Sequence, residues 1–445
     1  MSSIRRILIN VCLMASSVAA LMLAAAPGRA APASGAGKDP GSIAPGTVIT
    51  TKNWQQYRRF MPNGMQLLFE GKGSWKMPAD VSMTVGPTIG HPLPAGYVEA
   101  TRKYASKVAI AQLGDGGLIL KNYVAGEPFP NPSPPHAGWK ILANVWYRYL
   151  PHLIVHTPDG MGTFCLQDRY GNVACNQIIM VYRQMRHNTD PGVPMTTAGA
   201  GPRDYTEWTM VEEPEQLKYK ASLTIFYQDL AKPEDMYAFV PELRRTLRIN
   251  TSSRCAPEFG SDMTPDDRRY GFNGNITRFS AKLLGERRIL ALVNFNTQFG
   301  KFPSEYYMPL GWPKPSWGNW ELRDVYVIDV RRIPSQSAGY CYGRRIMYVD
   351  KNSYGIFWQD LYDSDLKLWK VALNAPRARM VPGVGVQDVS GSSLTIIWNL
   401  KDRHATYLFD ADPQGHDTVI NEQVPAQFHN VERYCGPAGL GEIMR

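Results

Sequence analysis

The chain has 445 residues, of which 44% are hydrophobic and 20% charged, and its formal net charge at pH 7 is +9. The arginines recur as dispersed pairs rather than in one basic run, which argues against a nucleic-acid-binding protein, so no nucleic acid partner is expected. Solvated strand faces explain most of these pairs, and contact with anionic lipid head groups is the alternative.

The first 30 residues predict a cleaved secretory signal peptide. Arg5 and Arg6 precede an apolar run over residues 7–26, and the small-residue stretch Gly28-Arg29-Ala30 follows. A membrane anchor is the competing interpretation, but the run is rich in alanine and leads into residues 31–46, a Pro/Gly/Ser-rich segment that we expect to be a flexible leader. Cleavage removes three arginines and lowers the formal net charge from +9 to +6. The sequence therefore predicts an exported protein.

Residues 47–445 are expected to form a single domain. This length exceeds the usual domain size, but large sheets can run long without dividing, and no composition or charge boundary interrupts the segment.

Helical spacing of apolar residues marks four segments, which are residues 51–69 with an interruption at Pro62, and residues 97–108, 137–150 and 234–247. Between them, residues 162–181 predict a β-hairpin that turns at Tyr170-Gly171-Asn172.

From residue 272 onward the pattern is nearly all strand. The expected strands are residues 276–284, 289–294, 320–332, 393–399 and 405–409. Residues 342–371 predict a three-stranded meander with turns at 350–353 and 363–365. In its middle strand, alternation places five residues on one face, namely Tyr354, Ile356, Trp358, Asp360 and Tyr362.

Consecutive strands joined by short turns pair antiparallel. The sequence therefore predicts an α+β fold, with one large, strongly curved antiparallel sheet and helices packed on one side of it.

Cysteine usage fits an oxidising compartment. Cys165 and Cys175 fall opposite each other in the predicted hairpin, and a cross-strand pair has the short separation that a disulfide requires. A second disulfide between Cys255 and Cys341 is expected, although Cys435 could replace either member.

The sequence shows no motif for enzyme chemistry, so we expect no enzyme activity, no cofactor and no metal. It has no nucleophile elbow, zinc-protease motif, phosphate-binding loop or dinucleotide fingerprint. His152 and His156 could share a metal, but no third ligand is evident, and structural histidines are favoured. The loop that begins at Asp410 resembles a calcium loop only at its start, and a hairpin turn is favoured.

Large aromatic residues recur on neighbouring predicted strands. The candidate ligand-binding residues are Trp320, Tyr326, Tyr348, Trp358 and Trp369. They could line one concavity of the sheet as a hydrophobic pocket, and core packing under the helices is the alternative.

Three segments resemble an exported Gram-negative family, domain of unknown function 1329. They are residues 47–88, 270–294 and 343–370, the last reading GRRIMYVDKNSYGIFWQDLYDSDLKLWK. That family is similar to the lipoprotein-localisation carriers LolA and LolB, whose fold is a half-barrel of antiparallel strands closed by helices around a cavity for acyl chains. The resemblance implies a half-barrel with helices against its concave side, and a periplasmic protein that could associate with the outer membrane. It also implies work beside an outer-membrane barrel and an inner-membrane exporter. It implies no catalytic residues.

The first hypothesis is a non-enzymatic carrier for a hydrophobic ligand such as a lipid, a lipoprotein acyl chain or another apolar compound. The second is an interaction protein with a fully packed sheet that docks on an outer-membrane or export complex. The third is an enzyme acting on envelope glycans, in which aromatic residues stack on sugars.

Overall fold

The structure is a computed structural model that describes residues 41–250, 254–295, 302–412 and 415–444. The predicted signal peptide, residues 1–30, and residues 31–40 of the predicted leader lie outside the described residues. Residues Pro40–Arg445 form one compact unit.

The helices are short. They are α1 (Asn63–Glu70), α2 (Ala95–Tyr104), α3 (Ala137–Trp146), α4 (Arg268–Gly271), α5 (Val431–Tyr434) and α6 (Pro437–Leu440), with the 3-10 helix η1 (Trp54–Phe60) before α1. Within the described residues, no helix is long and apolar enough to cross a membrane.

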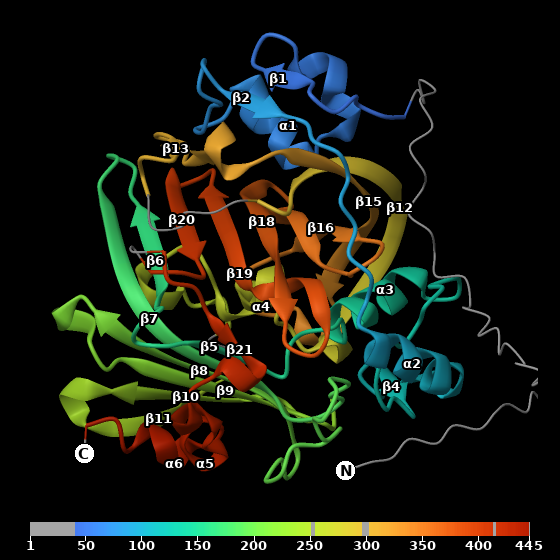
Figure 1. Cartoon of the computed structure of the whole chain (residues 1–445), viewed down its shortest axis with the longest axis vertical. Coiled ribbons are helices and arrows are strands. Elements are labelled where there is room, and N and C mark those ends of the chain that lie inside the picture. Colours follow the sequence, from blue (N-terminus) through green and yellow to red (C-terminus); the bar gives the residue numbers. More distant parts are fainter. Residues whose placement is uncertain (1–40, 251–253, 296–301, 413–414, 445) are drawn as a thin grey trace, which may run out of the picture. The chain divides into compact units, whose positions relative to one another are not determined.

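Strands make up most of the fold (Figure 1). The first eleven are β1 (Val48–Thr50), β2 (Ser82–Thr84), β3 (Ala109–Gln112), β4 (Leu118–Lys121), β5 (Leu153–His156), β6 (Gly162–Gln167), β7 (Val173–Gln184), β8 (Arg203–Glu213), β9 (Ala221–Tyr227), β10 (Asp235–Val240) and β11 (Arg245–Ile249). The others are β12 (Phe279–Leu292), β13 (Tyr306–Tyr307), β14 (Trp312–Pro313), β15 (Trp320–Arg332), β16 (Arg344–Asp350), β17 (Ile356–Tyr362), β18 (Leu368–Val381), β19 (Gly385–Asn399), β20 (His404–Phe409) and β21 (Val419–Ile420).

Fifteen strands form one sheet, which confirms the predicted α+β class and the large sheet. The strand order is β11-β10-β9-β8-β7-β6-β20-β19-β18-β17-β16-β15-β12, while β5 pairs with β7 and β21. Every neighbouring pair is antiparallel. The predicted hairpin is β6–β7, and the predicted meander is β16–β17–β18.

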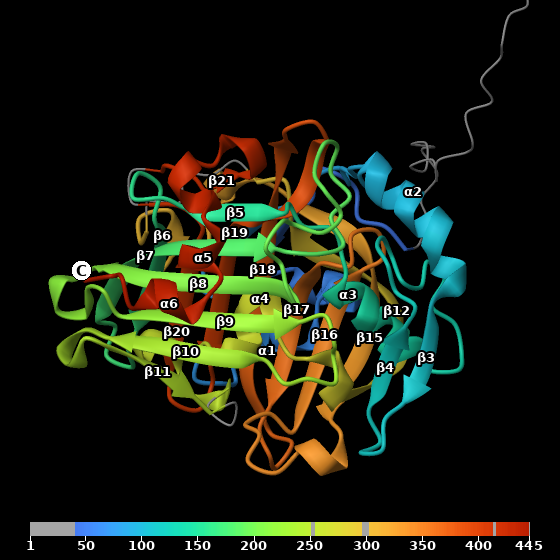
Figure 2. The same cartoon turned by 90° about the horizontal axis from the view of Figure 1, so that it is seen from below.

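The sheet curves around one hydrophobic cluster. This cluster contains Phe226 of β9 and Ile328 of β15, two strands that stand nine places apart in the sheet order. At about 4.8 Å per strand, a flat sheet would hold them more than about 40 Å apart. The sheet therefore bends until its two ends face each other, and Figure 2 shows β8–β11 crossing in front of β15–β18.

Helices cover both faces of the curved sheet. On the inner face, α3 belongs to the cluster that holds Phe226 and Ile328, as predicted. On the outer face, Met65 of α1 packs with Trp358 of β17, and Leu440 of α6 packs with Leu223 of β9. The predicted packing of helices on one side is thus confirmed by α3. Helices α1 and α6 lie on the other face, which the prediction did not include.

The segment predicted as a helix over residues 234–247 is instead the β10–β11 hairpin, so that prediction is wrong. Its apolar residues fit both helical and alternating spacing. The chain turns at Arg244, which has a left-handed φ of 49°, and β10 pairs with β9 along five residues. Pairing with a neighbouring strand outweighs local helical preference.

The middle strand of the meander does not place its five residues on one face. Tyr348 pairs with Trp358, but Val349 pairs with Ile356, so Phe357 is an extra residue in a β-bulge. The bulge reverses the alternation. Tyr354 and Ile356 therefore lie in the inner cluster, whereas Trp358 lies in the outer one.

Helix α1 docks on the outer face through a buried carboxylate. Pro62 precedes the helix, as the predicted interruption requires, because proline ends the preceding turn. The backbone N–H of Gly64 donates to Asp360 Oδ1 at 2.9 Å, and the Tyr348 hydroxyl donates to Asp360 Oδ2 at 3.1 Å. Burial is the main cause that raises the pKa of Asp360 to about 6, and these two donors oppose the shift.

We expect Asp360→Asn to remove a pH dependence of stability. The raised pKa means that between about pH 4 and pH 6 the folded state keeps a proton that the unfolded chain has lost. The free energy of unfolding of the wild type therefore falls as pH rises through this window, by up to about 3 kcal/mol. Urea unfolding at pH 4 and pH 6.5 measures the difference. An equal change in the free energy of unfolding between the two pH values in the wild type and the variant would contradict the role of Asp360.

Candidate ligand-binding sites

Three of the five predicted ligand-binding aromatics lie in the packed core of the outer face. Trp320, Tyr348 and Trp358 are 2%, 0% and 0% exposed. The rings of Trp320 and Trp358 stack with centroids 6.3 Å apart, and the Trp358 indole N–H donates to the backbone carbonyl of Leu290 in β12. The three side chains belong to the same hydrophobic cluster as residues of η1 and α1, so they pack as core residues.

The other two predicted aromatics lie elsewhere. Tyr326 stacks on Tyr354 at 6.3 Å and packs against the inner cluster. Trp369 contacts Tyr342 at 5.6 Å and lies under the ammonium of Lys370 at 4.2 Å. The structure thus does not bring the five residues to one concavity, and their role in ligand binding stays a prediction.

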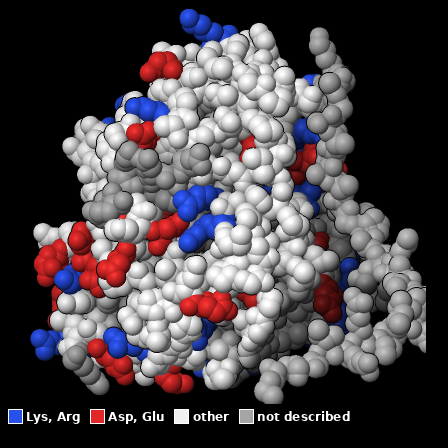
Figure 3. All heavy atoms as spheres, in the orientation of Figure 1, with Lys and Arg blue, Asp and Glu red and all other residues white. Residues whose placement is uncertain are grey.

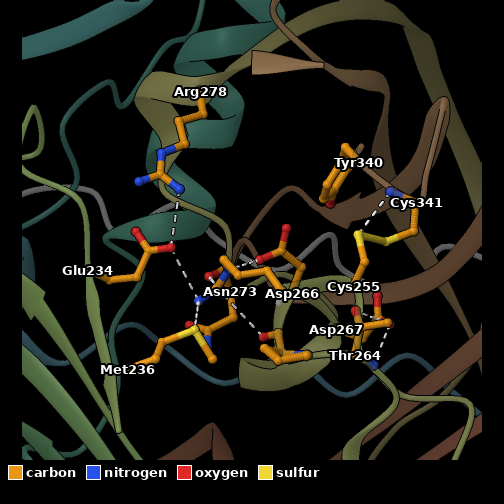
Figure 4. Close-up of polar contacts among 12 residues, drawn as sticks. Glu234, Met236, Cys255, Thr264, Asp266, Asp267, Asn273, Arg278, Tyr340 and Cys341 are labelled. Atoms are coloured by element: carbon orange, nitrogen blue, oxygen red, sulfur yellow. Dashed lines mark hydrogen bonds and ion pairs between the residues drawn. A yellow bond between two sulfur atoms is a disulfide. The ribbon is translucent and has the colours of Figure 1, made fainter. Parts of the chain in front are cut away.

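The chain's own residues 254–278 occupy the inner face. Arg254 forms ion pairs with Asp266 and, at 3.4 Å, with Glu234. Glu234 also pairs with Arg278 at 3.2 Å (Figure 4), and Asp266 pairs with Arg332 at 3.3 Å. All five side chains are at most 14% exposed. This network pairs each of the five buried charges with at least one opposite charge.

The same segment carries a second buried ion pair. Asp267 pairs with Arg345 at 2.9 Å, and it accepts hydrogen bonds from the backbone N–H and hydroxyl of Thr264 and from the Tyr342 hydroxyl. The Cys255–Cys341 disulfide ties the start of the segment to the loop before β16 (Figure 4).

One small, mainly apolar cavity lies beside this segment. Its volume is about 60 Å³, and its walls include Leu150, Ile154, Phe259 and Arg269. For comparison, an apolar cavity of about 150 Å³ can hold one benzene. This cavity is therefore too small for an acyl chain.

A much larger, partly apolar depression is a groove, which we call the hairpin groove, between the β3–β4 hairpin, the start of α3 and the start of β12. Its volume is about 630 Å³. Its apolar lining includes Val108, Ile110, Leu118, Phe129, Trp139 and Phe279. Of these, Trp139 and Phe279 form the buried floor, and the other four stay partly exposed.

The groove was not predicted from sequence, because β3 and β4 were not among the predicted strands. The signal was present, since Gly114-Asp115-Gly116-Gly117 separates two short apolar runs and such a stretch is typical of a hairpin turn. Placement of the hairpin beside α3 and β12 depends on tertiary packing that no local pattern shows.

The histidines considered as metal ligands pair with carboxylates. His152 Nδ1 lies 3.5 Å from Asp190, and His156 Nε2 lies 3.2 Å from Asp410. Across the described ranges, no group of three His, Cys, Asp or Glu side chains could hold a metal ion. Two members of the loop after Asp410, residues 413 and 414, lie outside the described residues.

Both predicted disulfides are present, Cys165–Cys175 and Cys255–Cys341. Cys435 is a free, buried thiol. Two disulfides fit an oxidising compartment, which is consistent with export. On the face shown in Figure 3, basic and acidic side chains are interspersed between large uncharged areas.

A family model described as Protein of unknown function (DUF1329) matches residues 48–432. Among curated proteins, none matches the chain. Solved structures that are similar include a putative outer membrane lipoprotein-sorting protein domain from Vibrio parahaemolyticus, at 13% identity and a TM-score of 0.45, covering 68% of this chain and 98% of that chain.

Two further solved structures are similar. A DUF1329 family protein from Desulfovibrio piger has 14% identity and a TM-score of 0.44, covering 67% of this chain and 98% of that chain. A LolA superfamily protein from Nitrosomonas europaea has 11% identity and a TM-score of 0.34, covering 64% of this chain and 92% of that chain.

Proposed function

Since the chain belongs to the DUF1329 family of proteins of unknown function, we propose from its own geometry that it is a non-enzymatic carrier that binds an apolar molecule in the hairpin groove. The observation that supports this proposal is the groove itself. Its volume of about 630 Å³ lies within the range of about 300–1,000 Å³ that is usual for ligand pockets.

The chemistry of the groove favours an elongated apolar ligand. Each buried methylene contributes about 0.8 kcal/mol, so a ten-carbon tail would contribute roughly 8 kcal/mol before ordering costs. The partly exposed Ile110 and Leu118 would lose contact with water when such a tail binds. A lipid, an acyl chain or another apolar compound would all satisfy this requirement.

The proposal includes the expected compartment and partners. Two disulfides and the N-terminal pattern of a signal peptide support a periplasmic carrier. An outer-membrane barrel and an inner-membrane exporter are the proposed partners, on the basis of the resemblance alone.

We expect Leu118→Glu to weaken binding of a fluorescent fatty-acid probe by tenfold or more, because it places a carboxylate in the apolar wall of the groove. Fluorescence titration of the purified protein measures the dissociation constant. The control is Leu247→Glu, since Leu247 is 44% exposed on β11 and is not among the groove residues. Equal affinity of the folded Leu118→Glu variant and the wild type would remove the groove as the site. Absence of probe binding by the wild type would favour the docking protein instead.

A further inference from the structure

Arg269 is a buried cation with two guanidinium nitrogens that have no hydrogen-bond partner among the described residues. The residue is only 8% exposed. Its guanidinium lies over the ring of Trp146 at 4.7 Å and over the ring of Tyr205 at 4.6 Å. Within the described part of the chain, its Nε and Nη1 atoms have no hydrogen-bond acceptor. Aromatic faces stabilise the charge but do not accept these N–H groups as an oxygen would.

The backbone holds Arg269 in a strained conformation. Arg269 and Tyr270 have φ angles of 53° and 58°, in the left-handed region that costs a non-glycine residue about 1–3 kcal/mol. The carbonyl of Arg269 accepts a hydrogen bond of 2.7 Å from Arg148 Nη2, which helps to hold this conformation. Residues in such conformations cluster at functional sites, where surrounding contacts impose the strain.

Arg269 borders two adjoining cavities, which we together call the Arg269 cavity. Their volumes are about 60 Å³ and 30 Å³. The larger one has mainly apolar walls, which include Leu150, Ile154, Ile178, Met180 and Phe259.

The acids that line the larger cavity have other partners. Glu258 pairs with Arg268, Asp267 with Arg345 and Asp410 with His156, while Glu207 accepts from Asn273. In the smaller cavity, Asp204 lies 3.4 Å from His187 Nε2 and forms no ion pair with Arg269.

The charge of Arg269 persists despite its burial. Burial lowers its pKa, but Tyr182, Tyr205 and Asp204 raise it above the ordinary value. A buried guanidinium with free N–H groups is costly unless an oxyanion or water completes its hydrogen bonds.

We propose that the Arg269 cavity binds a small monocarboxylate, with the carboxylate on the free N–H groups of Arg269 and a short apolar tail against Ile154, Ile178 and Met180. Carboxylate oxygens are strong acceptors for guanidinium, and the apolar walls favour an organic acid over a hydrated inorganic anion. The volume sets the size, because it is below the roughly 150 Å³ that holds a benzene. This site is separate from the hairpin groove.

Titration of the full mature chain with propionate tests the proposal, with calorimetry and thermal unfolding as readouts. We expect saturable binding and a rise in Tm with propionate but not with propionamide, which has the same shape and no charge. Arg269→Met should weaken propionate binding about tenfold to a hundredfold, the usual effect of losing hydrogen bonds to a charged group. Arg269→Lys keeps the charge but loses the planar donor set, so its affinity for propionate should lie between those of the wild type and Arg269→Met.

The matched control is Arg183→Met. Arg183 is also buried, its guanidinium donates to the carbonyl of His429, and neither residue lines either of the two cavities. Arg183→Met and Leu118→Glu should bind propionate as the wild type does. No binding by the wild type, equal binding of propionamide, or undiminished binding by Arg269→Met would overturn the proposal. If the hairpin groove did not bind an apolar ligand, only the fatty-acid titration would show it, and the propionate titration would be unchanged.

Discussion

Replacing Asp266 by asparagine is expected to lower the free energy of unfolding by about 3–5 kcal/mol. Asp266 is fully buried and pairs with both Arg254 and Arg332. Asparagine keeps the shape but not the charge, so Arg332 would lose its pair with Asp266 and Arg254 would keep only its pair with Glu234. Breaking a buried ion pair in this way costs about 3–5 kcal/mol. Chemical denaturation at pH 7 measures the loss.

The control for this variant is Asp324→Asn. Asp324 pairs with Arg288 at 3.1 Å, but its side chain is 59% exposed, and such surface pairs contribute at most about 1 kcal/mol. Similar losses in the two variants would show that the inner network does not stabilise the fold.

Asp266→Asn should also remove part of the acid denaturation. Burial raises the pKa of Asp266, but the guanidinium groups of Arg254, Arg332 and Arg345 more than reverse this, and the pKa is lowered to about 2. The stability that this carboxylate contributes is fully present above its ordinary pKa of 3.8 and is lost as pH falls towards 2. The variant should therefore depend less steeply on pH in this window.

Loss of the Cys255–Cys341 disulfide is expected to cost about 4–5 kcal/mol, more than the roughly 3 kcal/mol for Cys165–Cys175. The first closes a loop with a sequence separation of 86 residues and the second one of 10, and the entropy that a crosslink removes from the unfolded chain grows with loop length. Cys255→Ser/Cys341→Ser and Cys165→Ser/Cys175→Ser form the matched pair. Guanidinium unfolding measures the loss in free energy of unfolding for each double variant. A larger loss for Cys165→Ser/Cys175→Ser than for Cys255→Ser/Cys341→Ser would contradict the prediction.

The meander and the β6–β7 hairpin could be predicted from sequence because their turns carry local signals. Tyr170-Gly171-Asn172 places Cys165 opposite Cys175, and the structure has this register. The β10–β11 hairpin could not be predicted, since Met236, Phe239 and Leu247 fit a helical stripe as well as a strand, and only pairing with β9 decides between them.

The candidate site was harder to predict than the fold. A bulge at Phe357 moves Ile356 and Trp358 to opposite faces, and alternation in the sequence gives no sign of it. Arg269 looks like one member of an ordinary arginine pair, because a missing partner becomes visible only when every neighbour is placed. The large aromatics were the clearest local signal, and the core interpretation describes Trp320, Tyr348 and Trp358.

The junction of β6 with β20 has a consequence for how the chain acquires its fold. Cys165 of β6 pairs with Tyr407 of β20, so the centre of the sheet joins residues more than two hundred positions apart. Strands β7 to β11 pair with their neighbours in sequence, as do strands β15 to β19, so these two parts of the sheet can form early. The β6–β20 junction can form only after almost the whole chain is available. Until then β6 exposes an unpaired edge, a state prone to aggregation. Refolding should therefore be slow, and truncation before residue 404 should yield insoluble protein even though most strands remain.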